Sequence, residues 1–353
     1  MAFANGYTYR RTITIDESKV SGSSDFTDFT ILVSGTYAYL KTTANGGNVT
    51  NSSGYDIKFE TTGGTTLDYE RERYIATTGE VIFWVQIPTL SYNTNTDIYM
   101  YYNNSSVSTD QSNKTGTWES SYVCVYHLPD GTTLSGADST SNGITLTATG
   151  PTALSGGKVG GGAQQSSPAS YNGLWSGTIG SNLQLYSGSF GGWIKTSSPG
   201  ASYRGIFGVQ GAYGMFLVSN VFGMYSWGNG AFRSTGTSLN DGNWHQVYAV
   251  FDHNVSNGSK LYIDGALSLT TTITVQSFSA NLTAFIVASA GQELTGHLDE
   301  LRVENVKRSD DFVATQYNTQ NSPATFYSVG SEQTSGGGGS SNASARMLMG
   351  MGS

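Results

Sequence analysis

Two rows of acidic residues have the types and spacing that acid–base chemistry uses. In one expected strand, Asp68, Glu70 and Glu72 alternate with Arg71 and Arg73. Because successive side chains of a strand point to opposite faces, the carboxylates share one face and the arginines share the other. Pairs of carboxylates are the catalytic groups of glycoside hydrolases. A solvated or interfacial strand, with charges paired across neighbouring strands, is the simpler interpretation, and we favour it.

The second acidic row and the histidines do not strengthen the case for catalysis. Glu300, Arg302 and Glu304 share one face of another expected strand, but they do not form a Glu-x-Asp-x-Glu pattern. No Gly-x-Ser-x-Gly elbow with suitable partners is present, and no histidine pair has a metal-binding spacing such as His-Glu-x-x-His. The histidines are His127, His245, His253 and His297. We therefore expect a protein that is not an enzyme, with glycoside hydrolysis as the least favoured alternative.

Composition indicates an all-β protein with many turns. The chain has 353 residues, of which 12% are charged and 46 are glycine, and its formal net charge is -8. Clustered Lys and Arg are missing, so we expect no nucleic-acid partner. Cys124 is the only cysteine and lies in an apolar run, which predicts a small buried hydrophobe and excludes a disulfide within the chain.

Alternating apolar and polar residues divide the chain into tandem antiparallel β-sandwiches, and the resemblance described below implies that they are of the jelly-roll type. We expect a first sandwich over residues 1–116 and a second over 117–330, followed by a Gly/Ser linker and a Met-rich tail over 331–353. The clearest signal is the pair of strands around 244–252 and 260–263. Asp264-Gly265 follows them and predicts a tight turn with positive φ.

Several landmarks of the second unit resemble the laminin-G-like, concanavalin A-like family. They are Trp244-His245, the run Leu261-Tyr262-Ile263-Asp264-Gly265, the turn at 138–143, the strand at 190–195 and the closing strand at 297–303. The resemblance implies a concanavalin A-like sandwich. The order of motifs in residues 5–115 is similar to an uncharacterised β-domain of bacterial, archaeal and phage surface proteins, which implies no catalytic residue.

The same resemblance implies a structural calcium ion at the rim of the second sandwich. Asp138, Asn142 and Asp299 are the candidate ligands, because hard oxygen ligands in a turn suit calcium. The alternative is that Asp138 caps its own turn, as aspartates in such turns commonly do. We expect no other cofactor.

Aromatic residues in the expected loops of the second unit suit a carbohydrate ligand, because they can stack on sugar rings. The candidates are Tyr171, Trp175, Tyr203, Tyr213, Tyr225 and Trp227. Rows of Tyr and Trp serve equally well in protein interfaces, so core, interface and sugar platform stay open as alternatives. A cell-surface polysaccharide is thus one expected partner.

The end of the chain predicts a short helix and then a flexible tail. Ser309 has the features of an N-cap and is followed by acidic first-turn residues. Beyond the Gly/Ser linker, the tail could dock into a neighbouring subunit through adaptable apolar side chains. These are Met347, Leu348, Met349 and Met351. A disordered tail or a remnant of expression is the alternative.

Together these features predict a structural surface protein of a phage particle, either a capsid decoration or a fibre protein. Its partners would be other protein subunits, as a homo-oligomer or with capsid or tail proteins, and it would have no membrane span. The alternative is a secreted or cell-surface lectin-like adhesin that binds polysaccharide. No signal peptide is visible at the start of the sequence, and we expect a location on the virion surface or outside the cell.

Overall fold

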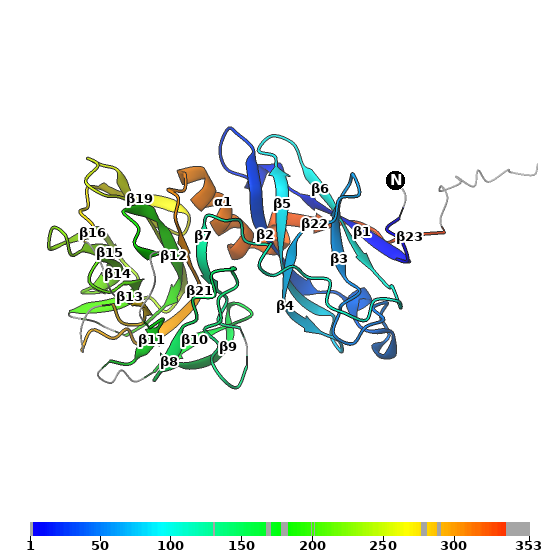
Figure 1. Ribbon diagram of the computed structural model, residues 1–353, viewed down its shortest axis with the longest axis horizontal. Helices are drawn as coiled ribbons and strands as arrows, with labels where there is room; N and C mark the ends of the chain where they lie inside the picture. The colour runs from blue at the N-terminus through cyan, green and yellow to red at the C-terminus, as the bar shows by residue number, and fades with distance from the viewer. Residues whose placement is uncertain are drawn as a thin grey trace, which may run out of the picture.

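Strands dominate the structure, a computed structural model in which residues 3–129, 131–166, 171–177, 183–198, 200, 202–276, 281–287 and 291–336 are described. They build two sandwiches that lie side by side, with helix α1 (Asp310–Asn321) between them (Figure 1). This arrangement confirms the all-β fold with a short helix near the C-terminus. Within the described residues, no helix is both long and apolar enough to cross a membrane.

The first sandwich packs two antiparallel sheets around an aliphatic and aromatic core. The β1 sheet has the order β22 (Tyr327–Val329), β1 (Tyr9–Ile15), β6 (Thr96–Tyr102), β3 (Lys58–Thr61), and β23 (Gln333–Thr334) also pairs with β1. The β5 sheet has the order β2 (Phe26–Thr36), β5 (Glu80–Leu90), β4 (Tyr69–Ile75). Short 3-10 helices occupy Glu17–Lys19, Ala38–Leu40 and Thr43–Asn45. Trp84 on β5 is fully buried, along with its neighbours Phe83 and Val85, because both faces of this strand are covered.

The end of the described chain returns to the first sandwich. After α1, the short helix α2 (Pro323–Phe326) leads into β22, and Val329 pairs with Ile13 while Thr334 pairs with Tyr9. Residues 327–334 therefore pair with the first sandwich, whereas the expected boundary at residue 330 divided them between the second sandwich and the tail. Sequence order hides this return, because residues 327–334 lie far along the chain from the strand they complete. The tail residues Met347, Leu348, Met349 and Met351 lie outside the described residues.

The second sandwich packs two larger antiparallel sheets. The β12 sheet has the order β19 (Ala266–Thr271), β18 (Ser259–Ile263), β17 (Trp244–Asp252), β12 (Ser187–Lys195), β21 (Gly296–Glu304), β10 (Gly161–Gln165), β9 (Thr152–Val159), and β7 (Tyr122–Tyr126) also pairs with β21. The β14 sheet has the order β16 (Ala231–Ser238), β15 (Val221–Ser226), β14 (Tyr213–Val218), β13 (Tyr203–Val209), β20 (Leu282–Ala284), β11 (Gly173–Trp175), β8 (Thr147–Thr149). Cys124 is fully buried in the core between them, as expected.

The hairpin signal at Asp264-Gly265 is confirmed. Strands β18 and β19 pair across it, with Ile263 opposite Ala266, and the two turn residues have φ values of 52° and 75°. Positive φ at both positions is the geometry that Asp-Gly favours.

Helix α1 begins at the expected cap and joins the two sandwiches. The Ser309 side chain accepts a hydrogen bond from the Phe312 backbone N–H at 3.1 Å. On one side Thr319 Oγ1 accepts from the Leu32 backbone N–H at 3.0 Å, and on the other the Trp193 indole donates to Gln320 at 2.6 Å. Because its partners come from β2 and β12, α1 fixes how the sandwiches meet.

Candidate functional site

An aromatic platform lies on the outer face of the β14 sheet. Inward residues of β14 and β15, such as Met215 and Met224, belong to the core of the second sandwich. The alternate residues therefore point outward. The platform consists of Tyr203, Phe216, Tyr225, Trp227 and Phe232, whose rings lie 4.8 Å apart for Tyr225–Trp227, 5.6 Å for Tyr203–Phe216 and 5.8 Å for Tyr203–Phe232.

Most of the platform is accessible to a ligand. Phe216 is buried, whereas the other platform rings are half-buried. The packing of these rings against one another holds them in place, and the four half-buried rings keep part of their surface exposed. An apolar surface of this kind on a polar sheet is typical of a binding site.

The structure brings three of the six aromatic candidates together and separates the others. Tyr203, Tyr225 and Trp227 belong to the platform, although only Tyr203 and Tyr225 lie within strands. Tyr213 points inward and is 0% exposed. This corrects its assignment as a sugar contact, because a core side chain cannot stack on a ligand.

The other two aromatic candidates stand apart from the platform. Trp175 lies on β11, which is separated from the platform strands by β20 in the sheet order. Tyr171 is 57% exposed, and its backbone N–H donates to the Glu293 carboxylate at 2.8 Å.

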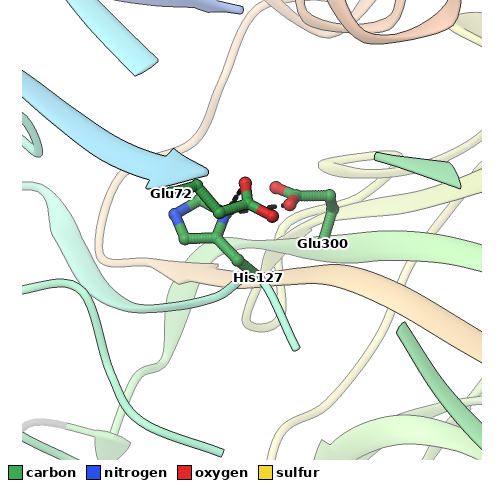
Figure 2. Close-up of side chains that lie close together, drawn as sticks. All are labelled: Glu72, His127 and Glu300. Carbon is green, nitrogen blue, oxygen red and sulfur yellow. Dashed lines mark hydrogen bonds and ion pairs between the residues drawn. The ribbon is translucent and has the colours of Figure 1, made fainter. Parts of the chain in front are cut away.

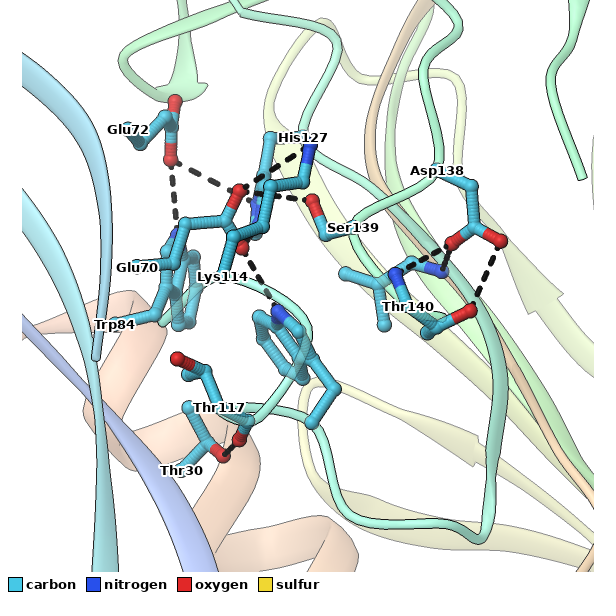
Figure 3. Close-up of polar contacts among 12 residues, drawn as sticks. Thr30, Glu70, Glu72, Trp84, Lys114, Thr117, His127, Asp138, Ser139 and Thr140 are labelled. Carbon is cyan, nitrogen blue, oxygen red and sulfur yellow. Dashed lines mark hydrogen bonds and ion pairs between the residues drawn. The ribbon is translucent and has the colours of Figure 1, made fainter. Parts of the chain in front are cut away.

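The candidate calcium ligands are already engaged by protein donors. The Asp138 carboxylate accepts backbone N–H groups from Val125, Thr140 and Ile144, as well as the Thr140 hydroxyl (Figure 3). It therefore acts as the cap of its own turn, the alternative considered from the sequence.

Asn142 and Asp299 also make hydrogen bonds within the protein, Asn142 as a donor and Asp299 as an acceptor. The Asn142 side-chain amide donates to the Val123 carbonyl at 2.9 Å. One Asp299 oxygen accepts the backbone N–H groups of Lys158 and Val159 at 2.7 and 2.8 Å. The Asp138 and Asp299 carboxylates are therefore occupied by backbone N–H groups, and Asn142 contacts the protein through its amide nitrogen.

A buried cluster of charged residues lies where the two sandwiches meet. We call Glu70, Glu72, His127, Glu300 and Arg302 the interface cluster. Glu70 and Glu72 of β4 point toward the second sandwich, Glu300 of β21 points back, and His127 follows β7 between them. The two acidic rows considered separately from the sequence thus face each other across the interface. The chain offered no local signal for this, because the rows are more than 200 residues apart.

His127 is held between carboxylates and indole rings. Its Nδ1 lies 2.8 Å from Glu300 Oε1, and its Nε2 lies 3.2 Å from Glu70 Oε2. The ring stacks on Trp84 with centroids 5.1 Å apart. Burial alone would lower the pKa of His127, but the charges of Glu300 and Glu70 raise it well above its ordinary value.

The two carboxylates of β4 have contrasting environments. Burial alone would raise the pKa of Glu70, but His127 and a 2.8 Å hydrogen bond from the Trp118 indole hold it below its ordinary value. Ser139 donates to the same carboxylate at 2.9 Å (Figure 3). Burial raises the pKa of Glu72 to about 8, and Glu300 adds to this rise while His127 opposes it.

Arg302 completes the cluster from β21. Its Nη2 donates to Glu300 Oε2 at 2.7 Å, and its guanidinium lies 4.8 Å from the Trp84 ring centroid and 5.0 Å from that of Trp118. The remaining members of the two rows pair elsewhere: Arg71 with Asp110, Arg73 with Glu80, and Glu304 with Arg308. The interfacial interpretation of the first row therefore fits the contacts.

A cavity of about 300 Å³ reaches the interface cluster from outside. Glu70, Glu72 and His127 line its inner wall, and Lys114 and Asp110 also line it. The cluster is therefore buried but can be approached by small ions and water.

Family models match two parts of the chain. Residues 178–314 match the concanavalin A-like lectin/glucanases superfamily (Laminin_G_3), and residues 53–133 match a domain of unknown function (DUF2341). No curated protein matches the sequence.

Several solved structures are similar to part of this chain, at low sequence identity. Domain 4 of AbnA, a GH43 extracellular arabinanase from Geobacillus stearothermophilus, in complex with arabinotriose, is 18% identical, with 56% of this chain and 98% of that chain covered at a TM-score of 0.44. The binding domain of Paraclostridial Mosquitocidal Protein 1 is 11% identical, with 56% of this chain and 52% of that chain covered at a TM-score of 0.45. Trypanosoma rangeli sialidase is 8% identical, with 69% of this chain and 43% of that chain covered at a TM-score of 0.43.

Proposed function

We propose, for a chain in which a concanavalin A-like lectin/glucanase domain follows a DUF2341 domain, that the protein binds polysaccharide as a surface-displayed, non-enzymatic lectin. The aromatic platform carries this proposal. It presents several half-buried rings side by side on one face of the second sandwich.

The physical basis is the match between aromatic rings and the apolar faces of sugars. A ring held by its neighbours loses little conformational freedom when a sugar stacks on it, so more of the contact energy contributes to affinity. Tyr and Trp also keep a polar group at the ring edge that can hydrogen bond to hydroxyls. Tyr225 and Trp227 are the best placed, because their rings pack at 70° to each other and offer a corner.

The position of the acidic residues supports binding without cleavage. Three of the carboxylates singled out from the sequence, Glu70, Glu72 and Glu300, lie in the interface cluster, which faces the first sandwich from the β12 sheet. The platform lies on the β14 sheet, which packs on the opposite side of the core. A polysaccharide on the platform is therefore separated from Glu70, Glu72 and Glu300 by the thickness of the second sandwich.

The part of the expectation that placed the protein on a phage particle stays a prediction. The residues expected to dock into neighbouring subunits, Met347 to Met351, lie outside the described residues. The present proposal therefore depends on the platform alone.

Affinity measurements on platform variants test the proposal. We expect Tyr225→Ala and Trp227→Ala to weaken binding to a polysaccharide selected on a glycan array by at least about tenfold, which corresponds to about 1.4 kcal/mol. Tyr171→Ala is the matched control, because this residue is exposed but lies outside the platform. Thermal unfolding of each variant checks that the fold is kept.

Two results would contradict the proposal. One is unchanged affinity in both platform variants while Tyr171→Ala reduces it. The other is release of reducing sugar from the bound polysaccharide by the unaltered protein, which would make it a hydrolase.

A further inference from the structure

The geometry points to a metal site at Glu72, His127 and Glu300 that ties the two sandwiches together. One ligand atom from each residue lies within 4.8 Å of the others. Glu300 Oε1 and Glu72 Oε2 lie 2.8 and 3.7 Å from the same histidine nitrogen, Nδ1 (Figure 2). The inferred ligand is a divalent transition-metal ion, for which zinc is the probe.

Glu70 orients the histidine for this role. Its carboxylate lies 3.2 Å from Nε2, so when a metal ion replaces the proton on Nδ1, the hydrogen that remains on Nε2 can be donated to Glu70. Metal-binding histidines generally hold their second nitrogen by such a carboxylate, which fixes the tautomer and ring orientation. Glu70 is a positioning residue here, not a ligand.

The two ligand carboxylates are also held from behind. The Trp84 indole donates to Glu72 Oε2 at 2.9 Å, and Arg302 donates to Glu300 Oε2 at 2.7 Å. The Glu72 side chain is only 3% exposed, yet its Oε1 has no hydrogen-bond partner among the described residues. A buried carboxylate oxygen without a partner is costly, and a cation that Glu72 binds through both of its oxygens would relieve that cost.

The donor set selects the class of ion. One imidazole nitrogen and two carboxylate oxygens suit zinc and its first-row neighbours, whereas calcium takes six to eight oxygen ligands. Glu70, Glu72 and Glu300 face Arg302 and, at the rim, Lys114. When His127 is neutral and all three glutamates are ionised, as metal binding requires, negative charge predominates. The cavity of about 300 Å³ that reaches Glu72 and His127 provides an entry path and room for a water ligand.

The ligands come from both sandwiches, which gives the site a consequence for the whole molecule. Glu72 lies on β4 of the first sandwich. His127 directly follows β7 and Glu300 lies on β21, and both strands belong to the second sandwich. A ligand that binds only the assembled state raises the stability of that state. Metal binding should therefore raise the unfolding temperature of the full chain.

Titration of chelator-treated full-length protein with zinc tests the inference. We expect one zinc ion per chain by calorimetry and a rise in unfolding temperature. Glu72→Gln should weaken binding at least about tenfold and abolish the rise, while the amide can still accept the Trp84 hydrogen bond. Glu70→Gln should reduce affinity about 10- to 100-fold through the histidine alone.

A second histidine provides the matched control. His245 also lies between two carboxylates, Asp264 at 2.8 Å and Asp241 at 3.1 Å, but on the surface of the second sandwich. We expect His127→Asn to remove zinc binding and His245→Asn to leave it unchanged. Circular dichroism without metal checks the fold of each variant.

The inference is overturned by any of three results. They are no zinc binding to the unaltered protein, equal binding in folded Glu72→Gln, or loss of binding in His245→Asn instead. Polysaccharide affinity measured in chelator is independent of all three, so the platform proposal and the metal site can fail separately.

Discussion

At the residue scale, two turns of this protein are each organised by an aspartate that contacts several polar groups. Asp138 caps the turn after β7. Asp264 accepts from the Gln246 backbone N–H at 2.9 Å and contacts His245 Nδ1 at 2.8 Å. In both cases the carboxylate replaces water around groups that a turn would otherwise leave without partners.

The contact between His245 and Asp264 predicts a pH dependence of stability. The hydrogen bond with Asp264, helped by the charges of Asp264 and Asp241, raises the pKa of His245 above its ordinary value, although burial opposes this. A raised folded-state pKa contributes stability that is complete below the unfolded value of about 6.5 and is lost as the pH rises through the folded value. The difference in unfolding free energy between the unaltered protein and His245→Asn should therefore shrink on going from about pH 6 to about pH 9.

Urea unfolding at both pH values measures this difference. Other titrating groups, such as His127, are present in both proteins and cancel in the comparison. In a protein that already carries Asp264→Asn, the effect of His245→Asn on the unfolding free energy should change less with pH, since the main partner of His245 is gone. A difference that is constant with pH, or that grows, contradicts the assignment.

Residue types alone could not separate the platform from the core. Tyr213 and Tyr225 both lie in apolar runs rich in Gly, and the sequence made them equal candidates. Strand register decides between them, because Tyr213 pairs with Ser226 on the inward face whereas Tyr225 pairs with Gly214 on the outward face. Which strand pairs with which, and therefore which face of the sheet each tyrosine occupies, cannot be read from the residues next to it in the sequence.

At the scale of elements, α1 is the wedge between the sandwiches (Figure 1). Phe312 packs against Phe29 of β2 with ring centroids 5.0 Å apart, and Tyr317 stacks on Trp193 of β12 at 5.6 Å. The N-cap at Ser309 was predictable because its signal lies within one turn of sequence. The position of the helix was not, because β2 and β12 are distant in the chain.

Removing the cap should loosen the wedge. Ser309→Ala leaves the Phe312 backbone N–H without its acceptor, and we expect a loss of about 1 kcal/mol in unfolding free energy. Ser309→Asp should retain most of the stability, since Asp is also a good N-cap. Equal stability of the Ala and Ser forms in urea unfolding would show that the cap is dispensable.

At the scale of the whole molecule, the first sandwich is discontinuous in sequence. Its β1 sheet needs β22 and β23, so the second sandwich is inserted between strands of the first. Phe326 and Tyr327 are buried in the first core, and the Tyr327 hydroxyl donates to the Ser34 carbonyl at 2.8 Å. Strands β22 and β23 lie far along the chain from the range expected for the first sandwich, and the sequence did not reveal their pairing because pairing between distant strands leaves no periodic signal.

Two truncations test the discontinuous sandwich. Ending the chain at Ser322 removes α2, β22 and β23, and the loss of the Phe326 side chain alone should cost about 3–5 kcal/mol. Ending it at Gly336 keeps these elements and should leave stability unchanged. If both truncated chains unfold at the same urea concentration, the returning strands contribute nothing to the first sandwich.

Pairing of Tyr9 with Thr334 places the two ends of the described chain at one end of the same sheet. Tension applied between these ends would act first on the hydrogen bonds between β23 and β1 and then on those between β22 and β1. It would break them one after another. The second sandwich lies outside this line of force. Force that separates the edge strands of the first sandwich would reach the β14 sheet last, so the platform would keep its shape while β23 and β22 detach from β1.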